Sequence, residues 1–292
     1  MRDSRRSGAL VTRMQKIKTF VRKTITTILI GDNGIAKLWW RVSRIFHKLT
    51  RYMNVYAYEE CASHNLRFPD LPVLFTEQFG QEGEDVIISA FIRALATRHK
   101  LSLQDETYLE VGGNHPIATS STYLLAKTFG MRGVIVEANP KLVPDLERIR
   151  RGDTIIHGAV QDKDVETVAL SISNANELSS VDRSFVLEWD NGKVGECELL
   201  TVPAYRINRI MEEHFAAKAP LYMSIDIEGM DLAVLKDMDF AKFRPAVIQA
   251  EPSDHHIYEN SRHMHEFMES KRYLLVARTN FNLVFVDRAR LS

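Results

Sequence analysis

The stretch YLEVGGNHP, residues 108–116, joins a short apolar run to a glycine-rich polar turn. A second stretch, GVIVEANP at residues 133–140, repeats this arrangement after an intervening segment with helical spacing of its apolar residues. Apolar runs that alternate with helical segments predict βαβ units around a parallel sheet. The two stretches therefore predict an α/β fold whose first strands are residues 108–111 and 133–137.

The same alternation continues through the rest of the chain. It predicts further strands at residues 154–157, 221–227 and 246–251, and helices at residues 81–99, 120–128, 140–149, 230–238 and 258–271. The last two apolar runs, residues 273–277 and 283–286, flank a turn-like segment and predict a hairpin. We therefore expect a mostly parallel sheet with an antiparallel last strand.

Length and composition limit the class of protein. The chain has 292 residues, 45% hydrophobic and 26% charged, which fits one or two ordinary globular domains. Its two cysteines, Cys61 and Cys197, lie far apart in sequence, which argues against a disulfide framework and fits the reducing cytoplasm. We expect an N-terminal helical extension, made of a basic arm at 1–52 and a helical lead-in at 53–104, then an α/β domain at 105–292 with a β-rich insert at 163–204.

Charge is divided unevenly along the chain. The net charge is zero, yet residues 1–52 carry 13 Lys or Arg against two Asp, so the remainder is acidic. Within residues 35–52, Trp39 and Phe46 belong to an apolar helical face, and five cations follow another face. Such a helix is typical of attachment to an anionic membrane surface, although the same face could pack on the body. Residues 1–30 also suit a transit peptide. No nucleic acid partner is expected.

Glycines follow the first expected strand, and an acid ends the second. Ligands of open α/β sheets bind at the carboxyl ends of the strands, and Gly112 and Gly113 permit close approach there. Glu137, 25 residues after Gly112, could hold a ribose diol by two hydrogen bonds. The dinucleotide fingerprint needs a later glycine, but Asn114 and His115 follow here. A nucleoside without pyrophosphate, such as S-adenosylmethionine, therefore fits better than NAD, and an NAD-dependent oxidoreductase stays the alternative.

These motifs together resemble the FkbM-type methyltransferases, in particular a branch with an Asn-His-Pro turn after the first strand. The resemblance covers residues 79–286 and rests on QEGED at 81–85, YLEVGGNHP with the following SSTYLL, GVIVEANP, and SIDIEGMDLAVLKDMDFAKFRPAVIQAE at 224–251. It implies a seven-stranded Rossmann-like enzyme with S-adenosylmethionine as cofactor, acting on a hydroxyl of a glycan, lipid-linked sugar or similar polyhydroxyl metabolite. Two positions depart from the family, which usually has Asp at Glu110 and Ala at Gly113.

The resemblance also implies places for individual residues. Glu110, Gly112 and Asn114 would lie near the methionine part of the cofactor, Glu137 on the ribose, Ala159 and Val160 near the adenine, and Asp226 and Glu228 at the reaction centre.

A hydroxyl acceptor must lose its proton during methyl transfer, so a base is needed. The candidates at or just after strand ends are Asp226, Glu228, Glu251, His255 and His256. The histidines near residue 255 could also suggest a divalent metal, but their spacing matches no dedicated motif, so we assign no metal ligand. A non-catalytic membrane adaptor on a methyltransferase fold would explain the basic arm and the two departures, but the acidic residues Glu137, Asp226 and Glu228 argue against it.

Overall fold

The computed structural model describes residues 78–173, 179–188 and 196–291. The predicted basic arm at 1–52, and the lead-in up to residue 77, lie outside these described residues. None of the helices in the described part of the chain is long and apolar enough to span a membrane.

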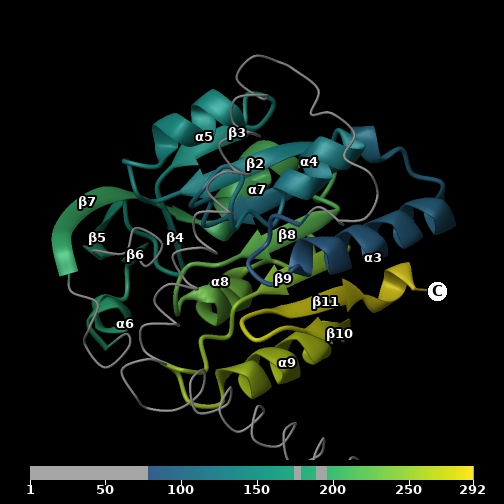
Figure 1. The fold of residues 1–292 in the computed structure, drawn as a ribbon. Coiled ribbons are helices and arrows are strands. Elements are labelled where there is room, and N and C mark those ends of the chain that lie inside the picture. The colour runs from purple at the N-terminus through teal and green to yellow at the C-terminus, as the bar shows by residue number, and fades with distance from the viewer. Residues whose placement is uncertain (1–77, 174–178, 189–195, 292) are drawn as a thin grey trace, which may run out of the picture. The chain divides into compact units, whose positions relative to one another are not determined.

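A mostly parallel sheet forms the centre of the described region (Figure 1). Its strands are β1 (Thr107–Val111), β2 (Arg132–Glu137), β3 (Thr154–His157), β8 (Tyr222–Ile225), β9 (Val247–Ala250), β10 (Tyr273–Arg278) and β11 (Leu283–Asp287). Among the described residues this sheet has seven strands in the order β10-β11-β9-β8-β1-β2-β3. Strand β11 is antiparallel to both β9 and β10, whereas the other neighbouring pairs are parallel. The predicted α/β fold with an antiparallel last strand is confirmed.

Helices cover both faces of the sheet. They are α3 (Glu84–His99), α4 (Tyr123–Phe129), α5 (Val143–Ile149), α7 (Ile207–Phe215), α8 (Asp231–Asp237) and α9 (Asn260–Ser270). Leu109 and Val111 of β1 pack in one buried cluster with α7, α8 and α9. Tyr108 of the same strand packs in a second cluster with α3, α4 and α5. Because strand side chains alternate between faces, a strand buried on both sides becomes a continuous apolar run.

The insert and the strand before it form a second, smaller sheet beside the first. The strands of this sheet are β4 (Ala159–Gln161), β5 (Thr167–Ser173), β6 (Ser179–Ser180) and β7 (Glu196–Arg206), in the order β4-β7-β5-β6, with α6 (Arg183–Glu188) after β6. Leu170 and Ile172 of β5 are buried against Ala159 and Val202, as the apolar and polar alternation in this stretch predicts. Helix α7, which follows β7 directly, was not predicted from the sequence.

Candidate active site

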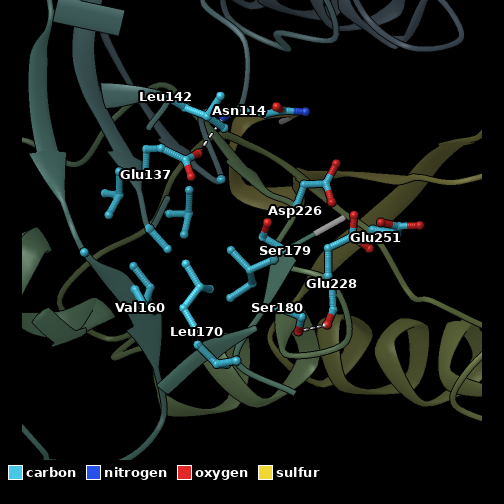
Figure 2. Close-up of a pocket in the computed structure, with 18 of the residues that line it drawn as sticks. Asn114, Glu137, Leu142, Val160, Leu170, Ser179, Ser180, Asp226, Glu228 and Glu251 are labelled. Atoms are coloured by element: carbon cyan, nitrogen blue, oxygen red, sulfur yellow. Dashed lines mark hydrogen bonds between the residues drawn. The ribbon is translucent and has the colours of Figure 1, made fainter. Parts of the chain in front are cut away.

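A cavity of about 330 Å³ lies at the carboxyl ends of the central strands (Figure 2). This volume is within the range of small-molecule sites, roughly 300–1,000 Å³. The turns after β1, β2, β8 and β9 contribute to its walls, together with β4 and the insert. The lining residues are Gln81, Val111, Gly112, Asn114, Thr119, Val136, Glu137, Ala138, Leu142, Gly158, Ala159, Val160, Leu170, Ser179, Ser180, Val181, Asp226, Ile227, Glu228, Glu251 and Phe281.

The turn after β1 needs glycine because another strand end lies against it. Gly112 has a φ of +91°, and a Cβ at this position would lie 2.0 Å from the carbonyl oxygen of Asp226. A Cβ on Gly113 would instead meet the Ile135 side chain at 2.5 Å, and Gly113 does not line the cavity. The pair of glycines therefore packs β1 against its neighbours, and Gly112 alone also faces the cavity.

Glu137 is held rigidly at the cavity wall. Its Oε2 accepts a hydrogen bond from the Asn114 amide at 2.7 Å (Figure 2). Its Oε1 accepts one from the Asn139 amide at 2.6 Å. Burial raises the pKa of Glu137, and these amide hydrogen bonds oppose the rise. Each carboxylate oxygen can accept more than one hydrogen bond, so both remain able to accept one from a ligand hydroxyl.

Glu110 belongs to a buried network behind the cavity and does not line it. Its carboxylate accepts hydrogen bonds from the Ser120 hydroxyl and the Ser121 amide, and it lies 3.9 Å from the Arg150 guanidinium. Arg150 is itself buried and pairs with Asp153 at 2.8 Å. Glu110 therefore fixes the segment before α4 and does not reach the cavity wall, where the sequence placed it.

One wall of the cavity is apolar. The predicted adenine residues Ala159 and Val160 line the cavity together with the apolar residues Val136, Ala138, Leu142 and Leu170. Ala159 and Val160 are buried on β4, which is adjacent to the turn after β3. This wall can accept a flat aromatic ring without burying an unpaired polar group.

Three carboxyl groups meet at the other end of the cavity. Asp226 and Glu228 follow β8, Glu251 follows β9, and carboxyl oxygens of the three lie within 4.8 Å of one another. Burial raises the pKa of Asp226, and a hydrogen bond to Glu251 opposes the rise. Burial raises the pKa of Glu251 far above its usual range, and the charges of Asp226 and Glu228 add to the effect. Acidic groups often gather without an ion, so we assign no metal here.

A further acid, Asp231, supports this end of the cavity and was not predicted from the sequence. Its carboxylate accepts a hydrogen bond from the Glu251 amide at 3.0 Å and one from the Ile227 amide at 3.3 Å. Asp231 is buried at the start of α8, so it connects the turns that follow β8 and β9. The sequence places Asp231 in the first turn of an expected helix. An acid there is explained by the helix dipole alone, so its position did not indicate a role at the cavity.

His255 does not line the cavity. Its ring packs edge-on against Phe185 of α6, and burial together with the neighbouring His256 lowers its pKa. The insert residues Ser179, Ser180 and Val181 do line the cavity, although the sequence predicted only that the insert covers the ligand edge.

Three non-glycine residues of the cavity lining have a left-handed backbone conformation. Asn114, Thr119 and Glu228 all line it, and each has a positive φ, at 41°, 63° and 55° respectively. A non-glycine residue in this region costs of order 1–3 kcal/mol and persists only where its surroundings fix it. Such residues are typical of functional sites.

Comparison with known proteins identifies the family. The profile described as the Methyltransferase FkbM domain matches residues 110–275, more than half of the chain. The chain belongs to the FkbM methyltransferase family. Family membership makes it an S-adenosylmethionine-dependent methyltransferase and not an NAD-dependent oxidoreductase. The Asn-His-Pro branch stays a prediction.

Other comparisons are more remote. No curated protein sequence matches this FkbM methyltransferase significantly. Among solved structures, an O-methyltransferase from Bacillus cereus in complex with SAH is 14% identical, with a TM-score of 0.38 over 91% of this chain and 96% of that one. A precorrin-6y C5,15-methyltransferase from Geobacter metallireducens is 10% identical, with a TM-score of 0.37 over 72% and 91%. Fibrillarin from Aeropyrum pernix with bound S-adenosyl-L-methionine is 11% identical, with a TM-score of 0.36 over 75% and 85%.

The cavity of this FkbM methyltransferase fits its cofactor in chemical terms. The apolar wall suits an adenine ring, the fixed carboxylate of Glu137 suits a ribose diol, and the acidic end suits a sulfonium cation. When bound, S-adenosylmethionine supplies an activated methyl group. The individual roles of these residues stay predictions.

Proposed function

We propose that this methyltransferase acts on a hydroxyl group of a glycan, a lipid-linked sugar or a similar polyhydroxyl acceptor. The observation that carries the proposal is the acidic end of the cavity, formed by Asp226, Glu228 and Glu251. Within the described part of the chain, no Lys, Arg or His lines this cavity. An acceptor with a carboxylate or phosphate at its reacting end would be repelled there, whereas hydroxyl groups can donate hydrogen bonds to the carboxylates.

The three carboxyl groups differ in whether they can accept a proton from the acceptor. Glu251 keeps its proton at neutral pH, because burial and two adjacent negative charges disfavour its ionised form. We therefore infer that Glu251 donates its hydrogen bond to Asp226 and that the proton of the acceptor passes to Asp226 or Glu228. His255 lies beside Phe185 and outside the lining of the cavity, which argues against it as the base.

Alignment is the other requirement of methyl transfer. The acceptor oxygen must lie in line with the methyl group and its leaving atom, so much of the rate acceleration comes from positioning. Two carboxylates on one short turn can accept hydrogen bonds from neighbouring hydroxyls of one sugar. This favours an acceptor with several hydroxyl groups over a simple alcohol.

We also propose, from the sequence of residues 35–52, that the enzyme works at an anionic membrane surface. Trp39 and Phe46 can enter the interface while the cations of the same helix stay at the headgroups. Lipid-linked acceptors would be concentrated on such a surface.

An acceptor panel tests the proposed reaction. The purified protein would be incubated with methyl-labelled S-adenosylmethionine and three groups of compounds: glycosides and polyols, carboxylic acids, and phosphate monoesters. We expect base-stable methyl ethers from the first group only. Base-labile methyl esters from the second group, without any ether product, would contradict the proposal.

A further inference from the structure

The insert reaches the turn that carries the acidic residues. Ser180 of β6 is 2% exposed, and its hydroxyl donates a hydrogen bond to the carbonyl oxygen of Glu228 at 2.8 Å (Figure 2). The same hydroxyl accepts a hydrogen bond from the Asp182 amide at 2.9 Å. A single buried side chain therefore connects the second sheet to the turn after β8.

Glu228 needs such a connection because its backbone is strained. Its φ is +55°, and the following residue, Gly229, has a φ of +96°. Glutamate has no local hydrogen bond of the Asn or Asp type to offset a left-handed backbone, so surrounding contacts must hold it. The hydrogen bond from Ser180 acts on the carbonyl group of the strained residue itself.

The rest of the insert covers the same turn. A Cβ on Gly229 would lie 3.3 Å from the Phe185 ring of α6. His256, after β9, contacts the Asp182 carboxylate at 3.2 Å and packs edge-on against Phe185. The insert therefore contacts both of the turns that carry carboxyl groups into the cavity.

We propose that Ser180 is a positioning residue for methyl transfer, whose hydroxyl holds the left-handed turn at Glu228 so that its carboxylate faces the transferred methyl group. Ser180 touches no reacting atom and acts through Glu228. The inference rests on the proposed place of Asp226 and Glu228 at the reaction centre. It assigns the insert a part in catalysis beyond covering the ligand.

Two cofactor analogues test this without an acceptor. S-adenosylhomocysteine has a neutral thioether where the methyl sulfonium would be, whereas sinefungin has a carbon bearing an ammonium group. The ratio of their dissociation constants, measured by calorimetry, therefore reports how well the carboxylates face the transfer point. The Glu228→Gln variant should weaken sinefungin roughly 10-fold relative to S-adenosylhomocysteine, the scale of a hydrogen bond to a charged group.

The Ser180 variants then separate positioning from folding. We expect Ser180→Ala to weaken sinefungin roughly 3- to 10-fold with S-adenosylhomocysteine affinity unchanged, and Ser180→Thr, which keeps the hydroxyl, to restore the ratio. In the Ser180→Ala/Glu228→Gln double variant, the alanine should add nothing, because both changes act on one interaction. Ser184→Ala is the matched control, since its hydroxyl contacts only the Asp182 carboxylate in the described structure.

The outcomes distinguish the two proposals. A normal ratio in Ser180→Ala beside a reduced ratio in Glu228→Gln would overturn the role of Ser180 and leave the reaction centre in place. Additive losses in the double variant would also overturn it, because Ser180 would then act by another route. Normal ratios in both Asp226→Asn and Glu228→Gln would instead contradict the proposed reaction centre.

Discussion

Carboxyl oxygens of Asp226 and Glu251 lie within 4.8 Å of each other at the ends of the adjacent strands β8 and β9. Burial and the neighbouring negative charges raise the pKa of Glu251, so Glu251 holds a proton beside the Asp226 carboxylate. Because the two groups interact, they titrate as a pair.

Stability should depend on this proton. A carboxyl whose folded pKa is raised contributes stability that is present in full below its unfolded pKa, near 4.3, and is lost as pH rises toward the folded value. Glu251→Gln removes the titration, so the variant should gain stability relative to the parent as pH rises from 5 to 8. The gain should approach about 1.4 kcal/mol per pH unit. Urea unfolding of both proteins at several pH values measures it, and a constant difference would contradict a raised pKa at Glu251.

Removing a carboxylate from the reaction centre should slow turnover. If Asp226 or Glu228 is the base, Asp226→Asn or Glu228→Gln should lower turnover by roughly 10²- to 10⁴-fold and leave the affinity for S-adenosylhomocysteine, which has no sulfonium charge, nearly unchanged. Single-turnover kinetics with an acceptor from the panel, with calorimetry of S-adenosylhomocysteine, gives both quantities. Full activity in both variants would exclude Asp226 and Glu228 as the base, whereas loss of S-adenosylhomocysteine binding would make the carboxylates structural.

Glu137 should contribute directly to cofactor affinity. We expect Glu137→Ala to weaken S-adenosylmethionine binding by about 1.5–3 kcal/mol, since hydrogen bonds to a charged group are lost. Glu137→Gln keeps the size of the side chain and one acceptor oxygen, so its loss should be smaller. Calorimetry that finds equal affinity in the parent and in Glu137→Ala would remove the ribose assignment.

Alanine substitutions at Gly112 and Gly130 distinguish the stability cost of backbone strain from that of steric overlap. Both have positive φ, but a Cβ at Gly130 would lie no closer than 3.4 Å to a flexible Gln104 side chain. Gly130→Ala should therefore cost about 1 kcal/mol of stability, whereas Gly112→Ala adds a clash with the Asp226 carbonyl group and should cost about 3 kcal/mol or more. Chemical denaturation of the two variants compares them, and equal losses would contradict the close approach of β1 and β8.

The basic arm should bind anionic vesicles. Sedimentation at low salt should show binding to anionic but not neutral vesicles, with each cation contributing up to about 1 kcal/mol, and salt should weaken it. Replacing Trp39 and Phe46 with Ser should abolish the binding. If the intact protein stays in the supernatant with anionic vesicles, the membrane proposal is contradicted. The apolar face would then pack on the body or bind a protein partner.

The sheet was predictable because its strands are buried on both faces. The apolar residues on both faces of β1 and β2 are direct consequences of that burial, although the buried Glu110 interrupts the run in β1. Helix α7 was missed because β7 ends at Arg206 and α7 begins at Ile207, so no turn residues separate them. The apolar residues of α7 do have helical spacing. Because the pattern of β7 runs directly into it, the sequence does not mark where the strand ends and the helix begins.

The site was predictable where it depends on strand ends and not where it depends on partners distant in sequence. Asp226 and Glu251 follow strands that pair with each other, so their proximity follows from topology. Glu110 lies in a buried network that includes Arg150. The two residues are far apart in sequence, so no local pattern predicts that they meet. The position of His255 depends on its contact with Phe185 of the insert. A single sequence gives no indication of such a contact.

Strand β11 follows β9 and β10 in sequence and yet lies between them in the described sheet. During synthesis on a ribosome, the edge of β9 therefore stays open until residues 283–287 have emerged. An open edge of buried-type strand residues invites pairing with other chains. Loss of residues 283–287 would leave this edge permanently exposed, so products truncated before β11 should aggregate and become substrates for chaperones and proteases, not shorter enzymes.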